Sequence, residues 1–141
     1  DKVLKDGEKV TLGGTTLVAR HTPGHTPGCT TWTAKVTDGK SKKLVVVVGS
    51  PNVNPGYQLV NNKAYPRIAK DFARTFKVLN SLKCDYFLGA HGNYYGMHAK
   101  YPKLKGAKVS PFIDPAGYRD YIELKEKAFR DKLAAQKKAS S

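Results

Sequence analysis

The chain has 141 residues, with 25 Lys and Arg against 11 Asp and Glu, which gives a net charge of +14 at neutral pH. The length fits one domain, and 40% hydrophobic with 26% charged residues is the balance of a globular protein. The 13 Gly and 8 Pro follow no repeat, which excludes collagen-like and low-complexity classes. The longest apolar run is too short to span a membrane, and two Cys are too few for a disulfide scaffold.

The positive charge is spread over two regions, residues 35–83 and 100–141, and is not gathered in one patch. A basic surface can bind nucleic acid or anionic membranes without specificity. The Lys and Arg residues are not interleaved with the aromatic pattern typical of RNA-binding modules. We therefore expect no specific nucleic-acid partner and no membrane partner. A non-catalytic, basic nucleic-acid-binding module is kept as the alternative from a different class.

Strand patterns occupy the first part of the chain. Residues 9–19 predict a β-hairpin around Gly13-Gly14, which tolerates positive φ. Residues 29–36 are rich in Thr, Trp and Val, and residues 43–48 form a continuous run typical of a strand covered on both faces. A long loop follows over residues 49–64, and loops of this length in compact domains are usually functional or disordered.

Helical patterns dominate the second part. One helix is predicted by an apolar stripe at steps of three and four: Ile68, Phe72, Phe76, Leu79 and Leu82. A short strand over residues 86–88 follows. A second helix begins with Asp114 as its N-cap and Pro115 in its first turn, and residues 137–141 are expected to be a disordered tail. This order of elements predicts an α/β fold whose sheet needs helical cover.

The segment Thr22–Gly28 (TPGHTPG) is the most unusual one in the chain. Each Pro fixes φ and each Gly permits tight turning, so His25 is held on a stiff loop between two strands. Rigid presentation suits a metal ligand, because an imidazole must be offered in one orientation. A rigid turn with an incidental His would give the same pattern, since the spacing is not a self-contained zinc motif.

His91 follows a short hydrophobic strand and is flanked by two small residues that leave it accessible. Functional sites gather at strand ends in α/β sheets, although a polar residue that merely ends the strand would look the same. His21 is interpreted as a solvated loop residue and His98 as a surface residue. Two His cannot complete a catalytic zinc site, which usually takes three protein ligands and water.

Three short polar side chains, Ser50, Asn52 and Asn54, lie just after the buried strand at residues 43–48. Their hydroxyl and amide groups can bind a water, a metal-bound ligand or a substrate carbonyl, or they can cap their own loop. The sequence has no nucleophile elbow around a Ser and no phosphate-cradling Gly loop. The residues alone therefore leave the chemistry incomplete.

Several segments together resemble metallo-β-lactamases, most closely the third subclass with its largely His-based dinuclear zinc site. They are Leu12–Thr15 (LGGT), Thr22–Gly28, Gly49-Ser50 with Asn54–Tyr57 (NPGY), and Gly89–Gly92 (GAHG). TPGHTPG by itself marks the wider superfamily, and its combination with NPGY and the helix start at Phe112–Pro115 narrows the subclass. The resemblance runs from Asp6 to Gln136.

The family fold is a four-layer αββα sandwich of two halves, and this chain resembles only the C-terminal half. The resemblance implies that residues 1–141 are the C-terminal portion of one domain. The family's other half carries a His-x-His-x-Asp-His ligand motif, which is absent from this sequence. By resemblance, His25 would bind one zinc and His91 a second zinc of the complete enzyme. Ser50 would orient bound water or a substrate carboxylate, and Asn54 would contact the substrate.

The implied activity of the complete protein is zinc-dependent hydrolysis of β-lactams, small molecules whose cleavage confers antibiotic resistance, by water activated on zinc. The alternative within the superfamily is a hydrolase of a thioester, lactone or phosphodiester. Resemblance implies a periplasmic or secreted location. The residues from Asp1 onward show no signal-peptide pattern, and a processed or truncated chain would look the same. The oligomeric state stays open.

We expect the chain alone to be inactive and to bind zinc weakly, because two ligands from separate loops leave the ion mostly hydrated. It should also expose a sheet face built to pack on the missing half. Cys29 and Cys84 are expected to be free thiols. In family members with a disulfide near the C-terminus, the partner of the cysteine matching Cys84 would fall around Ser110, where no Cys stands.

Overall fold

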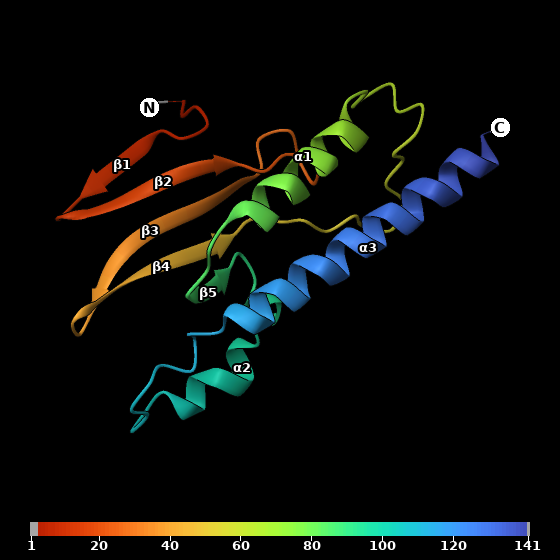
Figure 1. Cartoon of the computed structure of the whole chain (residues 1–141). Coiled ribbons are helices and arrows are strands. Elements are labelled where there is room, and N and C mark those ends of the chain that lie inside the picture. Colours follow the sequence, from red (N-terminus) through yellow and green to blue (C-terminus); the bar gives the residue numbers. More distant parts are fainter. Residues whose placement is uncertain (1–2, 141) are drawn as a thin grey trace.

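The structure is a computed structural model and describes residues 3–140. These residues form a five-stranded sheet in the order β1-β2-β3-β4-β5 (Figure 1). The strands are β1 (Lys9–Leu12), β2 (Thr15–His21), β3 (Thr30–Asp38), β4 (Ser41–Val48) and β5 (Tyr86–Gly89). The first four pair antiparallel with their chain neighbours, and β5 pairs parallel with β4. Each strand predicted from the sequence is present, with ends that differ by at most two residues.

The helices of the described residues are α1 (Ile68–Ser81), α2 (Met97–Lys100) and α3 (Pro115–Ala139), with 3₁₀ turns at Gly92–Tyr94 and Tyr101–Lys103. Helices α1 and α3 lie side by side against one face of the sheet (Figure 1). The Phe129 ring of α3 packs 5.5 Å from the Phe72 ring and 5.6 Å from the Phe76 ring of α1, centroid to centroid. The fold is mixed α/β, as predicted.

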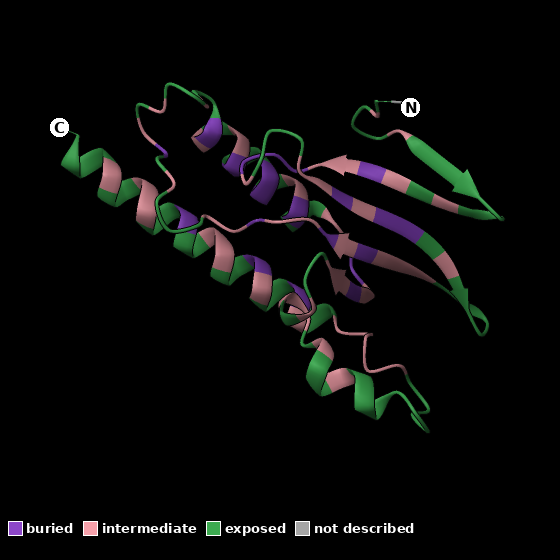
Figure 2. Cartoon of the chain, turned by 180° about the vertical axis from the view of Figure 1, so that it is seen from behind, coloured by how far each residue is buried: buried purple, intermediate pink, exposed green. Residues whose placement is uncertain are grey.

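The apolar stripe of α1 is its buried face, as predicted. Ile68, Phe72, Phe76 and Leu79 are buried, whereas Leu82 forms the C-cap and is only partly buried (Figure 2). A helix of this amphipathic kind takes most of its stability from such packing rather than from intrinsic propensity.

Strand β4 is covered more completely on one face than on the other. Val46 and Val48 are fully buried against the helices, whereas Val45 and Val47 on the opposite face are half-buried (Figure 2). The prediction of a strand covered on both faces is therefore wrong for this chain by itself. The cause is that α1 and α3 both pack on the same side of the sheet.

Helix α3 begins as the sequence predicts and ends later. The Asp114 side chain caps it by accepting a hydrogen bond from Gly117 N. The helix then continues to Ala139, so the expected disordered tail over 137–141 is corrected for the residues that the structure describes; Ser141 lies outside them. One turn before the end, Gln136 donates to Tyr57 O at 2.8 Å and accepts from Leu59 N at 2.6 Å. These bonds tie the last turns of α3 to the long loop.

Candidate functional site

His25 makes three contacts with the long loop that follows β4, two through its ring and one through its backbone carbonyl. Its Nδ1 lies 2.9 Å from Asn52 O, and its ring centroid is 5.7 Å from that of Tyr57. The Tyr57 hydroxyl also donates to His25 O at 2.9 Å. Because a carbonyl only accepts, Nδ1 is the donor in this bond, so Nε2 is the ring nitrogen that a neutral imidazole would offer to a metal. This is the orientation in which a histidine binds a metal.

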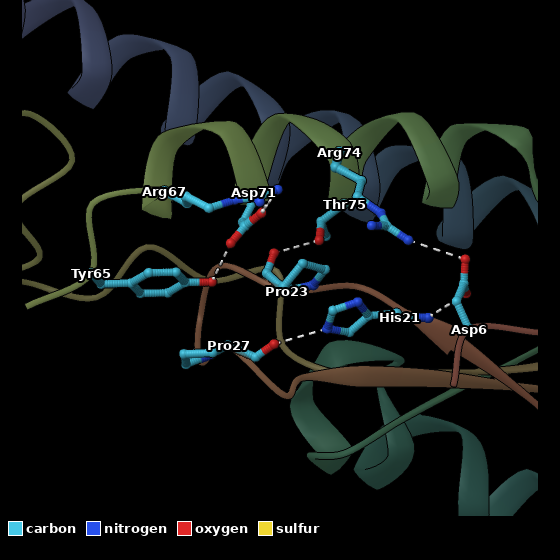
Figure 3. A network of polar contacts seen from close by, with 9 residues as sticks. All are labelled: Asp6, His21, Pro23, Pro27, Tyr65, Arg67, Asp71, Arg74 and Thr75. Carbon is cyan, nitrogen blue, oxygen red and sulfur yellow. Dashed lines mark hydrogen bonds and ion pairs between the residues drawn. The ribbon is translucent and has the colours of Figure 1, made fainter. Parts of the chain in front are cut away.

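Helix α1 holds the loop that carries His25. The buried Thr75 hydroxyl donates to Pro23 O at 2.6 Å (Figure 3). Next to it, Gly24 has φ +131°, and a Cβ atom there would lie 2.6 Å from Cγ of Phe72. A side chain at this position would collide with the buried ring, so the close approach of loop and helix requires glycine. Glycine in the first Pro-Gly step is thus required by the packing against α1 as well as by the turn.

His21 anchors the other end of the same loop. Its Nε2 bonds to Pro27 O at 2.8 Å, and its backbone N donates to Asp6 Oδ1 at 2.8 Å (Figure 3). Asp6 in turn accepts from Arg74 of α1 at 3.1 Å. The interpretation of His21 as a solvated loop residue is therefore wrong, because His21 is the half-buried last residue of β2. Its ring is a structural tie, which a sequence pattern does not reveal because the partner is a backbone carbonyl.

His91 stands at the exposed end of β5. Parallel pairing aligns Gly89 with Val48, and Ala90 N continues the ladder by donating to Val48 O at 2.9 Å. The His91 ring meets the Tyr94 ring edge to face, with centroids 5.1 Å apart. Because the loops after β4 and β5 leave the same edge of the sheet, His91 comes close to the residues that hold His25.

The two histidines share one groove of about 570 Å³. Its walls are His25, Asn52, Asn54, His91, Gly92, Asn93, Tyr94 and His98. His98 is exposed, as interpreted from the sequence, and it also lines this groove. His98 lies seven positions after His91, so the sequence already showed that the two histidines are close along the chain. Ser50 does not line this groove, but it hydrogen-bonds two residues that do.

The donor set of the groove fits one part of a zinc site. Three imidazoles lie at its walls, those of His25, His91 and His98, and the His25 ring offers Nε2. Among residues 3–140, however, no group of three or more His, Cys, Asp or Glu side chains could hold a metal ion. Further protein ligands for such a site would have to come from outside the described residues.

Both cysteines are free thiols in the structure, as expected. Cys29 accepts from Ser50 N at 3.1 Å, which places sulfur behind the groove rather than in it. Cys84 is buried and donates to Tyr86 O at 3.3 Å. Burial, followed by the charges of Asp85 and Asp114, raises the pKa of the Cys84 thiol to about 12. A thiol with so little thiolate at neutral pH is inert.

Solved structures of β-lactamases match almost the whole chain. FEZ-1, a metallo-β-lactamase from Legionella gormanii, is 50% identical with a TM-score of 0.94, over 97% of this chain and 52% of FEZ-1. BJP-1, a subclass B3 metallo-β-lactamase from Bradyrhizobium japonicum, is 39% identical with a TM-score of 0.90, over 100% of this chain and 53% of BJP-1. A β-lactamase from Chitinophaga pinensis is 30% identical with a TM-score of 0.87, over 95% of this chain and 51% of its own.

A curated relative gives a shorter match. A probable metallo-hydrolase from Burkholderia pseudomallei is 50% identical over 32 residues, which are 23% of this chain and 11% of the relative. No protein-family profile matches the sequence. The chain thus spans about half the length of the solved structures that it matches.

The fold is the C-terminal half of the metallo-β-lactamase fold, with a histidine groove at the edge of its sheet. The chain belongs to the metallo-β-lactamase superfamily, and its similarity extends to subclass B3, of which BJP-1 is a member. In the part of the chain that the structure describes, no helix combines the length and the apolar character needed to cross a bilayer.

Proposed function

We propose that the protein containing this chain is a zinc-dependent β-lactamase, in which the chain supplies His25 to one zinc and His91 to a second. The observation that carries this proposal is the meeting of the two histidines at one groove, although they lie 66 positions apart in the sequence. The 50% identity to FEZ-1 over 97% of the chain supports the β-lactam substrate class.

Zinc supplies Lewis acidity and lowers the pKa of water to about 7, which makes hydrolysis possible at neutral pH. The chain's own residues are proposed to hold the ligand side chains in place and to orient water or the substrate. The carbonyl of Asn52 fixes the tautomer of His25. Lys132 of α3 donates to Asn54 O at 2.7 Å, which steadies the exposed loop where Asn54 is proposed to contact substrate. Ser50, bonded to Tyr94 and Asn52, is proposed to orient water or the substrate carboxylate.

The remaining ligands are proposed to come from a His-x-His-x-Asp-His motif in the other half of the domain. Residues 1–141 would then be the C-terminal portion of that domain, inactive alone. A periplasmic or secreted location belongs to the same proposal, because β-lactams meet such enzymes outside the cytoplasm. The substrate would be a small molecule rather than a nucleic acid, which suits a groove walled by neutral polar and histidine side chains.

The test uses the complete coding sequence that contains this chain. We expect the purified protein to hydrolyse nitrocefin, to lose turnover on chelation, and to regain it with zinc. His25→Ala and His91→Ala should each abolish the zinc-restored turnover while the far-UV circular dichroism spectrum stays unchanged. Nitrocefin turnover that survives exhaustive chelation would refute the zinc site. A folded, zinc-loaded protein without any β-lactam turnover would refute the substrate class.

A second candidate is another metal-dependent hydrolase of the same superfamily, acting on a thioester, lactone or phosphodiester. The match to the probable metallo-hydrolase of Burkholderia pseudomallei supports it over a short segment. The same preparation decides between the two. Zinc-dependent turnover of one of these substrates, with none of nitrocefin, would favour the second candidate.

A further inference from the structure

Tyr94 lies between the two loops that carry the candidate ligands. It belongs to the 3₁₀ turn that follows His91, and its backbone N donates to His91 O at 3.0 Å. Its ring meets the His91 ring edge to face at 5.1 Å and stacks on Tyr121 of α3 at 5.2 Å. A Cβ atom at Gly89 would lie 3.0 Å from the Tyr94 ring, so the strand end is shaped to admit the ring. The ring is therefore held on several sides.

The hydroxyl of Tyr94 reaches across to the other loop. Asn52 Nδ2 donates to Tyr94 Oη at 2.8 Å, and Tyr94 Oη donates to Ser50 Oγ at 3.2 Å. The backbone carbonyl of the same Asn52 accepts from Nδ1 of His25. A continuous chain of contacts thus connects His25 to His91 through Asn52 and Tyr94.

These hydrogen bonds have a direction. The amide nitrogen of Asn52 can only donate, and a phenol has one proton to give. Since Asn52 donates to Tyr94 Oη, the phenol proton goes to Ser50 Oγ, which also faces Asn52 Nδ2 at 3.4 Å. Ser50 Oγ is therefore the acceptor in both bonds. The hydroxyl hydrogen of Ser50 is not used in either and is left to donate to another group.

We propose that Tyr94 is a positioning residue that couples the two candidate ligand loops: its ring sets the orientation of His91, and its hydroxyl sets Ser50 as a hydrogen-bond donor towards an anionic group of the substrate. The second part rests on the proposed function, because it needs a substrate with a carboxylate. The first part does not, because it concerns only the described residues. The two parts are separable, since one belongs to the ring and the other to the oxygen atom.

Tyr94→Phe keeps the ring and removes the hydroxyl. In the complete zinc-loaded protein we expect KM for nitrocefin to rise roughly five- to tenfold, which corresponds to losing one oriented hydrogen bond, while kcat changes less than twofold. The methyl ester of the same substrate, which lacks the anion, should show no such rise. Tyr95→Phe is the matched control. Tyr95 is the next residue, and its ring packs on Phe87 and Phe112 away from the groove.

Tyr94→Leu removes the ring, and its effect is read in the complete protein without metal or substrate. We expect the ring hydrogens of His91 to lose the chemical-shift displacement that an adjacent aromatic ring causes, whereas Tyr94→Phe keeps it. The side-chain amide signals of Asn52 should shift in both variants and stay in place in Tyr95→Phe. If the leucine variant loses its dispersed amide spectrum, Tyr94→Met takes its place, because a flexible thioether fills irregular space.

Each part has its own refutation. Unchanged His91 ring shifts in a folded Tyr94→Leu or Tyr94→Met chain would overturn the role of the ring. A KM for nitrocefin in Tyr94→Phe equal to that of Tyr95→Phe would overturn the role of the hydroxyl, as would an equal rise with the methyl ester. If the complete protein does not hydrolyse β-lactams at all, the proposed function fails, and the shifts of His91 and Asn52 still decide whether Tyr94 couples the loops.

Discussion

At the scale of single residues, the position of the His25 loop depends on the absence of a Cβ atom at Gly24. Gly24 sits where the loop touches α1, and the space that a Cβ would need is occupied by the buried ring of Phe72. The neighbouring Pro23 is also buried and is bonded through its carbonyl to Thr75. A methyl group at Gly24 must therefore move either the ring or the loop. Either displacement reaches His25, which is the next residue.

Gly24→Ala should lower the free energy of unfolding by roughly 2–5 kcal/mol, because backbone strain and overpacking add. Gly13→Ala is the matched control. Gly13 also has positive φ, at +55°, but nothing lies within 4 Å of its added Cβ. We expect it to cost about 1–2 kcal/mol from strain alone. Denaturant unfolding of both variants measures the difference, and equal losses would show that the contact with Phe72 does not matter.

Asp114 combines a helix cap with an ion pair. It accepts from Gly117 N at 2.9 Å and from Lys100 Nζ at 2.6 Å. Burial by itself would raise the pKa of Asp114, but the hydrogen bonds from Lys100 and Gly117 and the charge of Lys100 outweigh it and hold the pKa below its ordinary value. A carboxyl whose pKa is depressed on folding stabilises the fold above its unfolded pKa, and this stability is lost as pH falls through the folded one.

We therefore expect the stability of the chain to fall below about pH 4, near the pKa of an unfolded Asp. Asp114→Asn should flatten this fall and cost about 1 kcal/mol at pH 7. Asp131→Asn serves as the control, because Asp131 pairs with Lys127 on the open surface and such pairs contribute little. Unfolding curves between pH 3 and pH 7 provide the measurement. The same pH dependence in Asp114→Asn as in the unchanged chain would contradict the assignment.

Which site residues the sequence can reveal depends on what they contact. His25 and His91 were predicted as candidate ligands because backbone-directing residues frame them, and Pro, Gly and strand ends leave a local pattern. The coupling role of Tyr94 and the tie made by His21 depend on partners 42 positions and 6 positions away, one of them a backbone carbonyl. No local spacing encodes such contacts. The metal and substrate roles of His25, His91, Ser50 and Asn54 stay predictions.

At the scale of elements, α1 is both the cover of the sheet and the support of the candidate site. Its apolar stripe was predictable from periodicity alone. Thr75 lies on the same buried face and is polar, so the stripe did not include it. Its hydroxyl is nevertheless the atom that joins the helix to the His25 loop. A hydrophobic pattern identifies the packed face of a helix but does not indicate a polar contact within that face.

Thr75→Val tests this connection with almost no change of side-chain volume. It leaves the buried carbonyl of Pro23 without its donor, so we expect a loss of about 1–3 kcal/mol in the free energy of unfolding. Thr16→Val is the control. The Thr16 hydroxyl bonds with that of Thr11 on an exposed part of the β1–β2 pair, and its loss should stay within about 0.5 kcal/mol. Equal effects of the two substitutions would mean that the Thr75 bond contributes no more than a surface contact.

The prediction of a disordered tail after α3 and the prediction that β4 is covered on both faces were wrong for the same reason. A sequence pattern shows which side chains are apolar, but not which other element will meet them. Gln136 and the long loop satisfy each other's polar groups and extend α3 beyond its apolar stripe. Val45 and Val47 have the composition of a doubly covered strand, yet the elements of this chain cover only the opposite face.

At the scale of the whole molecule, the partly exposed side of the sheet and the incomplete ligand set agree with each other. Trp32, Val45 and Val47 are half-buried and apolar, and they lie on the face away from α1 and α3. The groove beside this sheet has His25, His91 and His98 at its walls, but among residues 3–140 no group of three or more His, Cys, Asp or Glu side chains could hold a metal ion. An uncovered sheet face and an incomplete ligand set are both expected of a chain that spans about half the length of its structural relatives.

Zinc binding by the 141-residue chain follows from this incomplete set. Two imidazoles on separate loops leave the ion mostly hydrated, and ordering the loops around it offsets part of the binding energy. We expect the chain to lose zinc on dialysis and the complete protein to keep it. Zinc content measured by atomic absorption after dialysis distinguishes the two, with His25→Ala and His91→Ala of the complete protein as intermediate cases. One zinc retained per 141-residue chain, and lost again in His25→Ala, would mean that this chain already holds a full ligand set.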